Sequence, residues 1–563
     1  IDGEPLTFDD QLVELKIQDI VLSDGAAEHM CKTADFVDDL LVNLYDEPPF
    51  YEVTDRDDLI GELVFGMAPH TSAAVIGRVV GFTSAAVGYA HPYFHAAKRR
   101  NCFHPETRIW YQNTENRWQH RPIREVVESH LHDPRFDDVG TQIQELEADL
   151  YVPAINANGE ETLQRIEAVS KHQAPAHLVR IETHSGREIT LTPDHDMHTF
   201  DDGHIASTRA SELTTGDHAV IPTKLESVSP SGQTPEFDLL NECIEDDSIS
   251  LTQVTLHTTD GASDREREDL SASSLVSFVE RTWECRETTT DTQNGVVSLE
   301  EILSVDHLTA DKLVRLPAET QIGSPGEDIT MNKQLEIDAD LAFVLGCYAT
   351  AGSIQHGTDT GYDNGDSDVV TIFETTKPEV RRSIIRTLAK VGIETYNETE
   401  SHLVIPGRIL KLLFETVLDA GRCASQKHVP RAMFDAPDAV VRSYLNGCFD
   451  VTSVSESTDA LTTCTSSRAL KEDILALSRR IGMSTCVTCA DTAGGSPKGK
   501  PVRQYRLFGC TGEHAHRREC RVCESAHISG YPQSAVVDGG CDTYRVDPIA
   551  TVEYIEADTA YTY

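Results

Sequence analysis

The 563-residue sequence is poor in basic residues and has no long apolar run. Lysine and arginine number 48 against 93 acidic residues, a formal net charge of −45. A surface of this charge repels phosphate backbones unless basic residues gather locally. No eighteen consecutive apolar residues occur, so we expect no membrane span, and no charged-then-apolar leader opens the chain. We expect a cytoplasmic location, and a fragment at both ends because the sequence starts at Ile1 and stops at Tyr563.

The acidic residues are spread along the whole chain rather than confined to a tail. This is typical of a folded protein from a salty cytoplasm, because molar salt screens self-repulsion within about 3 Å. The alternative is an ordinary acidic protein. Apolar residues make up 39% of the chain, which argues against disorder. The 14 cysteines stand at irregular spacings without a secretion signal, so we expect reduced thiols.

The first unit is predicted over residues 1–101. Met30, Ala34, Val37 and Leu41 recur at three-four spacing behind Ser23, which predicts a capped amphipathic helix. A polar and basic stretch follows near residue 91, and a cluster of cations favours phosphate contact in so acidic a chain. The alternative is a surface helix whose cations suit its dipole. The candidate DNA-binding residues are His91, His95, Lys98, Arg99 and Arg100.

Three stretches of this unit, "QLVELKIQDIVLS", "APHTSAAVIGRVVGF" and "VGYAHPYFHAAKRRNC", resemble the large subunit of the archaeal family D DNA polymerase, or DNA polymerase II. The resemblance implies templated DNA synthesis and 3′–5′ exonuclease activity in a two-subunit assembly. It also implies DNA and a small subunit as partners, and a divalent metal such as Mg²⁺ as cofactor. In that family "AKRRNC" runs straight into the metal-binding aspartates. Here Phe103 follows Cys102, so we expect the metal ligands outside this chain.

Cys102 at this seam is followed by "TPDH" at 192–195 and by Gly216-Asp217. The three together resemble the splicing blocks of inteins, self-excising insertions with the all-β Hint fold. The resemblance implies that the acyl group of Asn101 moves to the Cys102 sulfur, because a thiol is a strong nucleophile near neutral pH. His195 would protonate the leaving nitrogen. Thr192 would hydrogen-bond near the scissile peptide, and Asp217 would order a turn.

Complete splicing in that family also requires a terminal His-Asn or His-Gln. The sequence stops at Tyr563, before such a pair. We therefore expect a thioester at Cys102 and loss of residues 1–101 to an added thiol, without ligation of the flanking halves. No cofactor is expected for this step.

A second resemblance covers residues 336–490. "LAFVLGCYATAGSI" and "VVRSYLNGCFDVTSVS" resemble the two motif helices of LAGLIDADG homing endonucleases. In that family an acidic residue at the end of each helix binds the metal that activates water. Here Ala351 and Thr452 occupy those positions, and neither offers a charged ligand. Asp450 stands two positions before Thr452. We expect a degenerate endonuclease that keeps the fold.

A cysteine- and histidine-rich stretch follows. The spacing of its thiols and imidazoles suits tetrahedral zinc, and the alternative is a loop with incidental thiols. The candidate zinc ligands are Cys510, His514, His516, Cys520 and Cys523. Another C-x-x-C pair, Cys486 and Cys489, is predicted on a strand, where residues three apart point to opposite faces.

The sequence thus predicts a multidomain α+β protein. The predicted units are a polymerase segment at 1–101, the first Hint part at 102–223, a linker or accessory region at 224–335, an α+β endonuclease-like domain at 336–490, a Cys/His-containing linker at 491–540 and a last Hint part at 541–563. Two other classes stay open. One is a stand-alone homing endonuclease or DNA-binding protein, and the other is a non-enzymatic interaction protein with an acidic surface.

Overall fold

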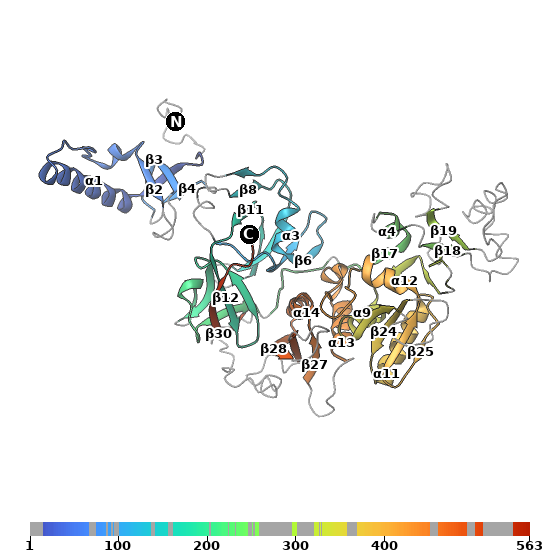
Figure 1. Ribbon diagram of the computed structural model, residues 1–563. Helices are drawn as coiled ribbons and strands as arrows, with labels where there is room; N and C mark the ends of the chain where they lie inside the picture. Colours follow the sequence, from blue (N-terminus) through green and yellow to red (C-terminus); the bar gives the residue numbers. More distant parts are fainter. Residues whose placement is uncertain are drawn as a thin grey trace, which may run out of the picture.

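The computed structural model contains both helices and sheets, so the mixed α+β class is confirmed (Figure 1). None of the helices in the described part of the chain is long and apolar enough to cross a membrane. The structure describes residues 15–66, 75–85, 88–91, 94, 101–136, 141–155, 161–201, 204–222, 224–230, 232–245, 250, 254–257, 296–300, 320–325, 327, 329–356, 369–450, 460–492, 502–510 and 544–563.

The N-terminal unit has a small sheet and one long helix, drawn in blue in Figure 1. The predicted amphipathic helix is confirmed as α1 (Asp24–Leu44), and the Ser23 hydroxyl accepts a hydrogen bond from the Ala26 N–H at 3.4 Å. The four strands lie in the order β2-β3-β1-β4. They are β1 (Asp19–Ser23), β2 (Leu63–Gly66), β3 (Val75–Thr83) and β4 (Tyr89–Ala90).

The next body is mainly β and is built from two distant parts of the chain. Its largest sheet has the order β13-β12-β30-β16-β14-β15. These strands are β12 (His177–Thr183), β13 (Glu188–Leu191), β14 (Asp196–Asp201), β15 (His204–Arg209), β16 (His218–Pro222) and β30 (Tyr544–Glu556). Strands β12 and β13 form a hairpin, with Gly186 at φ +78° in its turn, as expected from the alternating apolar residues on both sides of Ser185-Gly186. Because β30 lies between β12 and β16, the strands on either side of residues 223–543 share one sheet.

Two smaller sheets complete this body. One has the order β10-β9-β5-β6 and the other β31-β11-β8-β7. Their strands are β5 (Arg108–Gln112), β6 (Trp118–Pro122), β7 (Arg135–Phe136), β8 (Gln142–Glu145), β9 (Tyr151–Ile155), β10 (Glu161–Arg165), β11 (Ala168–Gln173) and β31 (Tyr561–Thr562). A short helix, α3 (Ile123–Glu128), follows β6 directly.

The inserted domain is organised around two crossing helices, α9 (Ala339–Ala351) and α13 (Asp438–Asp450). The two backbones nearly touch, because a Cβ at Gly346 would lie 2.0 Å from the Tyr444 carbonyl oxygen. A Cβ at Gly447 would lie 2.1 Å from that of Phe343. Each helix leads into a sheet and a further helix. The sheets have the orders β23-β24-β26-β25 and β27-β29-β28.

The remaining elements of the inserted domain are as follows. The helical segments are α11 (Pro378–Lys390), α12 (Arg408–Lys411), a π-helical turn (Leu412–Val417), a 3₁₀ turn (Arg431–Phe434) and α14 (Arg468–Arg480). The strands are β23 (Gly352–His356), β24 (Val369–Glu374), β25 (Asn397–Glu398), β26 (His402–Pro406), β27 (Ala460–Thr465), β28 (Ser484–Thr492) and β29 (Val502–Cys510). Leu470, Ile474, Leu477 and Ile481 recur at helical spacing, and this apolar face is buried on and directly after α14.

The structure differs from the predicted boundaries at two places. Strand β29 lies between β27 and β28, so backbone hydrogen bonds carry the inserted domain past residue 490. The described parts of 224–335, expected as a linker or accessory region, also contribute buried side chains to its core. Their elements are α4 (Leu239–Glu245), β17 (Glu236–Asp238), β18 (Thr255–His257), β19 (Val296–Ser298), β20 (Gln321–Gly323), β21 (Thr330–Asn332) and β22 (Gln334–Glu336).

Candidate functional site

Cys102 is 2% exposed and lies in an extended segment along the free edge of β13. Its N–H donates to Thr192 Oγ1 at 3.1 Å, and its carbonyl accepts from the Thr192 N–H at 2.9 Å. Phe103 bridges Leu191, and the His104 N–H donates to the Thr190 carbonyl at 3.0 Å. This antiparallel pairing continues the sheet and fixes the peptide that joins Asn101, itself half-buried, to Cys102.

Thr192 and His195, both predicted site residues, stand at the two ends of one tight turn. The His195 N–H donates to the Thr192 carbonyl at 3.0 Å. Pro193 follows Thr192, and its fixed φ suits the second position of a β-turn. The far side of the turn is anchored, because the Ala210 N–H donates to the His195 carbonyl at 2.8 Å. The turn "TPDH" therefore places the Thr192 hydroxyl on the Cys102 N–H and the His195 ring against Phe103, the next residue along the chain.

The His195 ring packs on the Phe103 ring, with centroids 4.3 Å apart. Burial lowers the pKa of His195 to about 4, while the Asp196 carboxylate opposes the shift and His198 adds to it. Within the described residues, the buried Nδ1 of His195 has no hydrogen-bond partner. At neutral pH the imidazole is therefore mostly uncharged, and it can accept a proton before it gives one away.

Asp217 caps a turn at the start of β16. Its Oδ2 accepts from the Thr214 N–H at 2.7 Å and from the Thr214 hydroxyl at 3.1 Å. Gly216 has φ +100°, a conformation that glycine adopts without strain. The Asp217 carbonyl accepts from the Ile549 N–H at 2.7 Å, which ties the turn to β30. All of these contacts lie within the turn or join it to β30.

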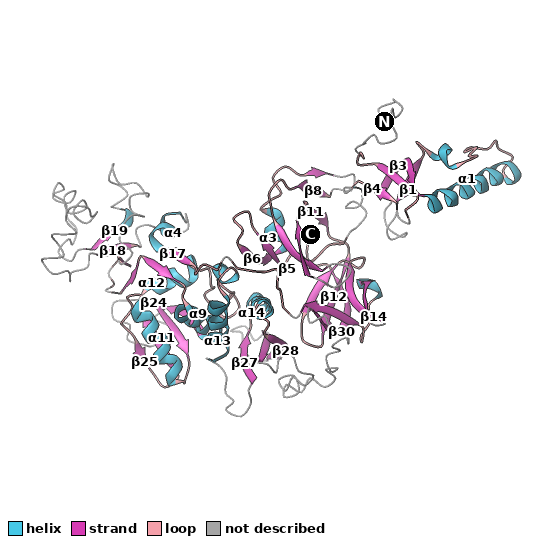
Figure 2. Cartoon of the chain, turned by 180° about the vertical axis from the view of Figure 1, so that it is seen from behind, coloured by secondary structure: helices cyan, strands magenta, loops and turns pink. Residues whose placement is uncertain are grey.

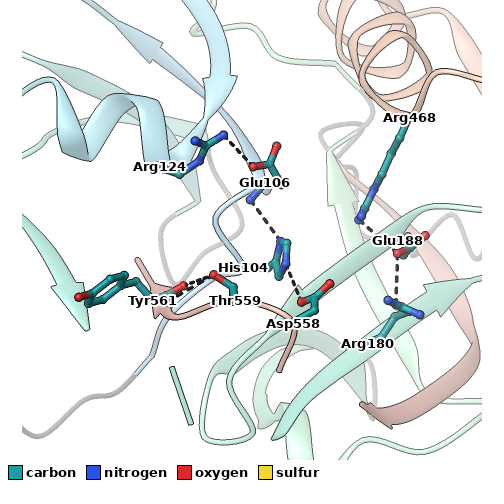
Figure 3. Close-up of polar contacts among 9 residues, drawn as sticks. All are labelled: His104, Glu106, Arg124, Arg180, Glu188, Arg468, Asp558, Thr559 and Tyr561. Carbon is teal, nitrogen blue, oxygen red and sulfur yellow. Dashed lines mark hydrogen bonds and ion pairs between the residues drawn. The ribbon is translucent and has the colours of Figure 1, made fainter. Parts of the chain in front are cut away.

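Tyr563 pairs with Phe103, the residue that follows Cys102. The Phe103 N–H donates to the Tyr563 carbonyl at 2.6 Å, and the Tyr563 N–H donates back to the Phe103 carbonyl at 3.0 Å. In Figure 3 the His104 ring lies between Glu106 and Asp558. Because His104 Nδ1 accepts from the Glu106 N–H at 3.2 Å, its Nε2 carries the proton that faces Asp558 at 3.2 Å. The segment that begins at Cys102 is thus hydrogen-bonded to β13 and its following turn on one side and to Tyr563 on the other.

Sequence reasoning missed a buried carboxylate in this body. Asp547 on β30 is fully buried and accepts hydrogen bonds from the Ser185 N–H, at 3.2 Å, and from the Ser185 hydroxyl. Arg187 NH1 lies 3.9 Å from its Oδ2. An acidic residue inside the otherwise apolar run "RVDPIATV" was the available signal, since buried carboxylates are rare unless paired.

Of the other predicted residues, the structure describes His91 and Ala351, and neither belongs to the sheet that holds Cys102. His91 lies in the N-terminal unit, and Ala351 ends α9. The remaining predicted residues, His95, Lys98, Arg99, Arg100, Thr452, His514, His516, Cys520 and Cys523, lie outside the described residues, as does the side chain of Cys510. Among the described side chains, no three His, Cys, Asp or Glu residues gather as a metal site.

The chain is similar to known proteins of two kinds, DNA polymerase large subunits and inteins. A family model for "DNA polymerase II large subunit DP2, catalytic domain" matches residues 1–110. The DNA polymerase II large subunit of Haloquadratum walsbyi is 42% identical over 616 residues, which cover 100% of this chain and 27% of that protein. That of Halobacterium salinarum is 53% identical over 301 residues, 53% of this chain and 21% of that protein.

The chain is a relative of the DNA polymerase II large subunits. It spans about a quarter of the length of these curated relatives, 27% and 21% for the two named. Among solved structures, the "Pab PolII Intein" is 31% identical with a TM-score of 0.19, over 21% of this chain and 63% of that one. An intein from a hyperthermophile is 27% identical with a TM-score of 0.20, over 22% of this chain and 71% of that one.

Proposed function

We propose that this chain processes itself at the Asn101–Cys102 bond, as the first step of protein splicing. The observation that carries the proposal is the reciprocal pairing of the buried Cys102 with Thr192. A thiol next to an immobilised peptide, with an uncharged imidazole in the adjoining turn, is a nucleophile with a proton carrier. Residues 102 onward would be the insertion, and residues 1–101 the host segment before it.

The proposed step is an N-to-S acyl shift that balances within the chain. The Cys102 sulfur attacks the Asn101 carbonyl carbon, a C–S bond forms, and the C–N bond breaks. The thiol proton passes to neutral His195 and then to the departing Cys102 nitrogen, so His195 acts first as base and then as acid. The hydrogen bond to Thr192 keeps that nitrogen in place as it changes from amide to amine. No cofactor takes part.

Thiol-induced cleavage tests this proposal. The purified chain in molar KCl is treated with dithiothreitol, and its products are weighed by mass spectrometry beside those of Cys102→Ala. We expect a cut between Asn101 and Cys102 in the wild type alone, with residues 1–101 released as a thiol adduct. Equal cleavage in both proteins, or none in the wild type, would refute the proposal and favour a non-enzymatic interaction protein.

We also propose that the inserted domain is a degenerate LAGLIDADG endonuclease. The close glycine contacts between α9 and α13 support two related motif helices. The spacing that separates Gly346 from Gly447 also separates Ala351 from Thr452, so both acid positions lack a carboxylate. Magnesium-dependent nicking of DNA that carries the uninterrupted insertion site should be absent. Efficient cleavage would instead favour the stand-alone endonuclease.

The host function is proposed from the relatives. It is DNA-directed DNA synthesis with 3′–5′ exonuclease activity, on DNA and with a small subunit. The described residues do not fit the divalent metal that this chemistry requires, since they contain no group of three suitable side chains, and we assign them no metal-dependent step. Full-length polymerase from the same gene, assayed for primer extension before and after removal of the insertion, tests this proposal. Activity should appear only after removal.

A further inference from the structure

The inserted domain contacts both chain segments that meet at the Asn101–Cys102 junction. Its α14 supplies Asp473 to one segment and Arg468 to the other. In Figures 1 and 2, α14 lies on the side of the inserted domain that faces β5, β6 and β12. None of these contacts belongs to the proposed chemistry at Cys102.

The first contact is made with the segment that begins at Cys102. Arg108, six residues further along, places Nε 2.8 Å from Asp473 Oδ1, and His120 on the paired strand β6 places Nδ1 2.9 Å from the same oxygen. Asp473 is fully buried, and its Oδ2 accepts from the Val429 N–H at 3.3 Å. Because a buried carboxylate is stable only when paired, the β5–β6 hairpin and α14 depend on each other.

The second contact is made with the segment that ends at Thr192. Glu188 opens β13, and its side chain is 7% exposed; its Oε1 lies 3.2 Å from Arg468 NH2 and 3.3 Å from Arg180 Nε (Figure 3). At about 3.3 Å per residue, Glu188 is about 13 Å along the strand from Thr192. Glu188 and the acceptor of the Cys102 N–H thus lie on one short, continuous segment.

The turn of the β12–β13 hairpin also docks on β28 of the inserted domain. The Ser185 carbonyl accepts from the Val487 N–H at 2.8 Å, and Arg187 donates to the Thr485 carbonyl at 3.3 Å. At Gly186 an added Cβ would lie 2.1 Å from the Val487 carbonyl oxygen. The hairpin thus rests directly on the backbone of the inserted domain.

We infer that α14 and β28 of the inserted domain are positioning elements for the acyl shift, because they hold the Cys102 segment and the β13 segment in register. This inference rests on the proposed self-processing at Cys102. The inserted domain would then act in splicing through geometry, whatever its own activity on DNA. Its residues are positioning residues and do not touch the reacting atoms.

The matched pair Gly186→Ala and Gly232→Ala tests the inference in the full chain. Both glycines have φ +78°, so both variants carry the same backbone strain, but nothing lies within 4 Å of a Cβ at Gly232. We expect Gly186→Ala to slow dithiothreitol-induced cleavage about 10- to 100-fold, since small displacements of reacting groups have effects of this size. Gly232→Ala should cleave at the wild-type rate.

Variants at Arg468 test the same inference if Gly186→Ala fails to fold. Arg468→Gln should slow cleavage by a few-fold, and Arg468→Lys should restore most of the rate. Lys390→Gln, which breaks the ion pair with Asp340 inside the inserted domain, should change nothing. Amide hydrogen exchange at residues 188–195 should rise in Gly186→Ala and Arg468→Gln only. This readout reports local positioning separately from global stability.

The outcomes separate the two hypotheses. Wild-type rates and exchange in Gly186→Ala and Arg468→Gln would overturn the positioning role and leave self-processing intact. Equal slowing in Gly186→Ala and Gly232→Ala would also overturn it, because backbone strain alone would then account for the effect. Cleavage that is absent from the wild type, or that persists in Cys102→Ala, would refute the proposed function itself.

Discussion

The pH dependence of cleavage distinguishes the possible roles of His195. Its pKa of about 4 leaves roughly one imidazole in a thousand protonated at pH 7. If neutral His195 takes the thiol proton and passes it on, the rate should be nearly constant from pH 5 to 7. If an already protonated ring were needed beside a neutral thiol, the rate would fall about tenfold per pH unit over this range. Attack by a thiolate formed beforehand, with no imidazole involved, would instead raise it about tenfold per unit.

The assay measures the first-order rate of residue 1–101 release at dithiothreitol concentrations where the rate no longer depends on the thiol. The acyl shift is then the limiting step. His195→Gln keeps a polar side chain but cannot carry the proton, so we expect a rate about 10²- to 10⁴-fold lower. The turn hydrogen bonds are made by the backbone of residue 195, so we expect this change to leave them in place.

A tenfold rise in rate from pH 7 to pH 6 would refute the base-then-acid sequence. It would mean that the charged imidazolium, despite its burial, is the form that acts. A His195→Gln variant that cleaves as fast as the wild type would remove His195 from the mechanism altogether.

Three further changes have defined outcomes. Thr192→Val leaves the buried Cys102 N–H without its acceptor, so urea unfolding should show a loss of about 1–3 kcal/mol and cleavage should slow, whereas Thr192→Ser should behave as wild type. Gly447→Ala should destabilise the inserted domain by about 1–3 kcal/mol, measured by tryptophan fluorescence in urea, while Gly25→Ala, with open space around it, should not. Burial lowers the pKa of Lys427 to about 6 from 10.5. Between these values the unfolded chain binds more protons and stability rises with pH, so Lys427→Met should be more stable than wild type at pH 7, with a gain that shrinks toward pH 10.

Local pattern was sufficient to predict several elements. The three-four spacing behind Ser23 predicted α1. Alternation on both sides of Gly186 is typical of the hairpin β12–β13, and the apolar residues at helical spacing from Leu470 are typical of α14. Each depends on contacts within a few residues of sequence. The grouping of Cys102 with Thr192 came instead from the resemblance to splicing blocks, because no local rule pairs residues ninety positions apart.

Other features depend on tertiary context that the sequence does not display. Asp547 becomes buried only because β30 enters the sheet between β12 and β16, more than three hundred residues after them. The contacts of Asp473 with Arg108 and His120 likewise join segments separated by over 350 positions. The depressed pKa of His195 follows from burial against Phe103, and burial of a histidine cannot be inferred from "TPDH" alone.

Strands β5 and β6 share one hydrophobic core with the inserted domain, so removal of that domain would expose their tryptophans. Trp118 on β6 is 1% exposed, and Trp110 on β5 lies with its ring centroid 5.4 Å from that of Phe434 in the inserted domain. A tryptophan buries roughly 200 Å², and at about 25 cal/mol per Å² the exposure of even half of this area costs about 2.5 kcal/mol. For two such residues the loss approaches the whole stability of a small domain, about 5–15 kcal/mol. A chain cut down to residues 1–222 and 544–563 would therefore need polar replacements at Trp110 and Trp118 before its cleavage rate could report on α14, which is why point variants of the full chain are the sharper test.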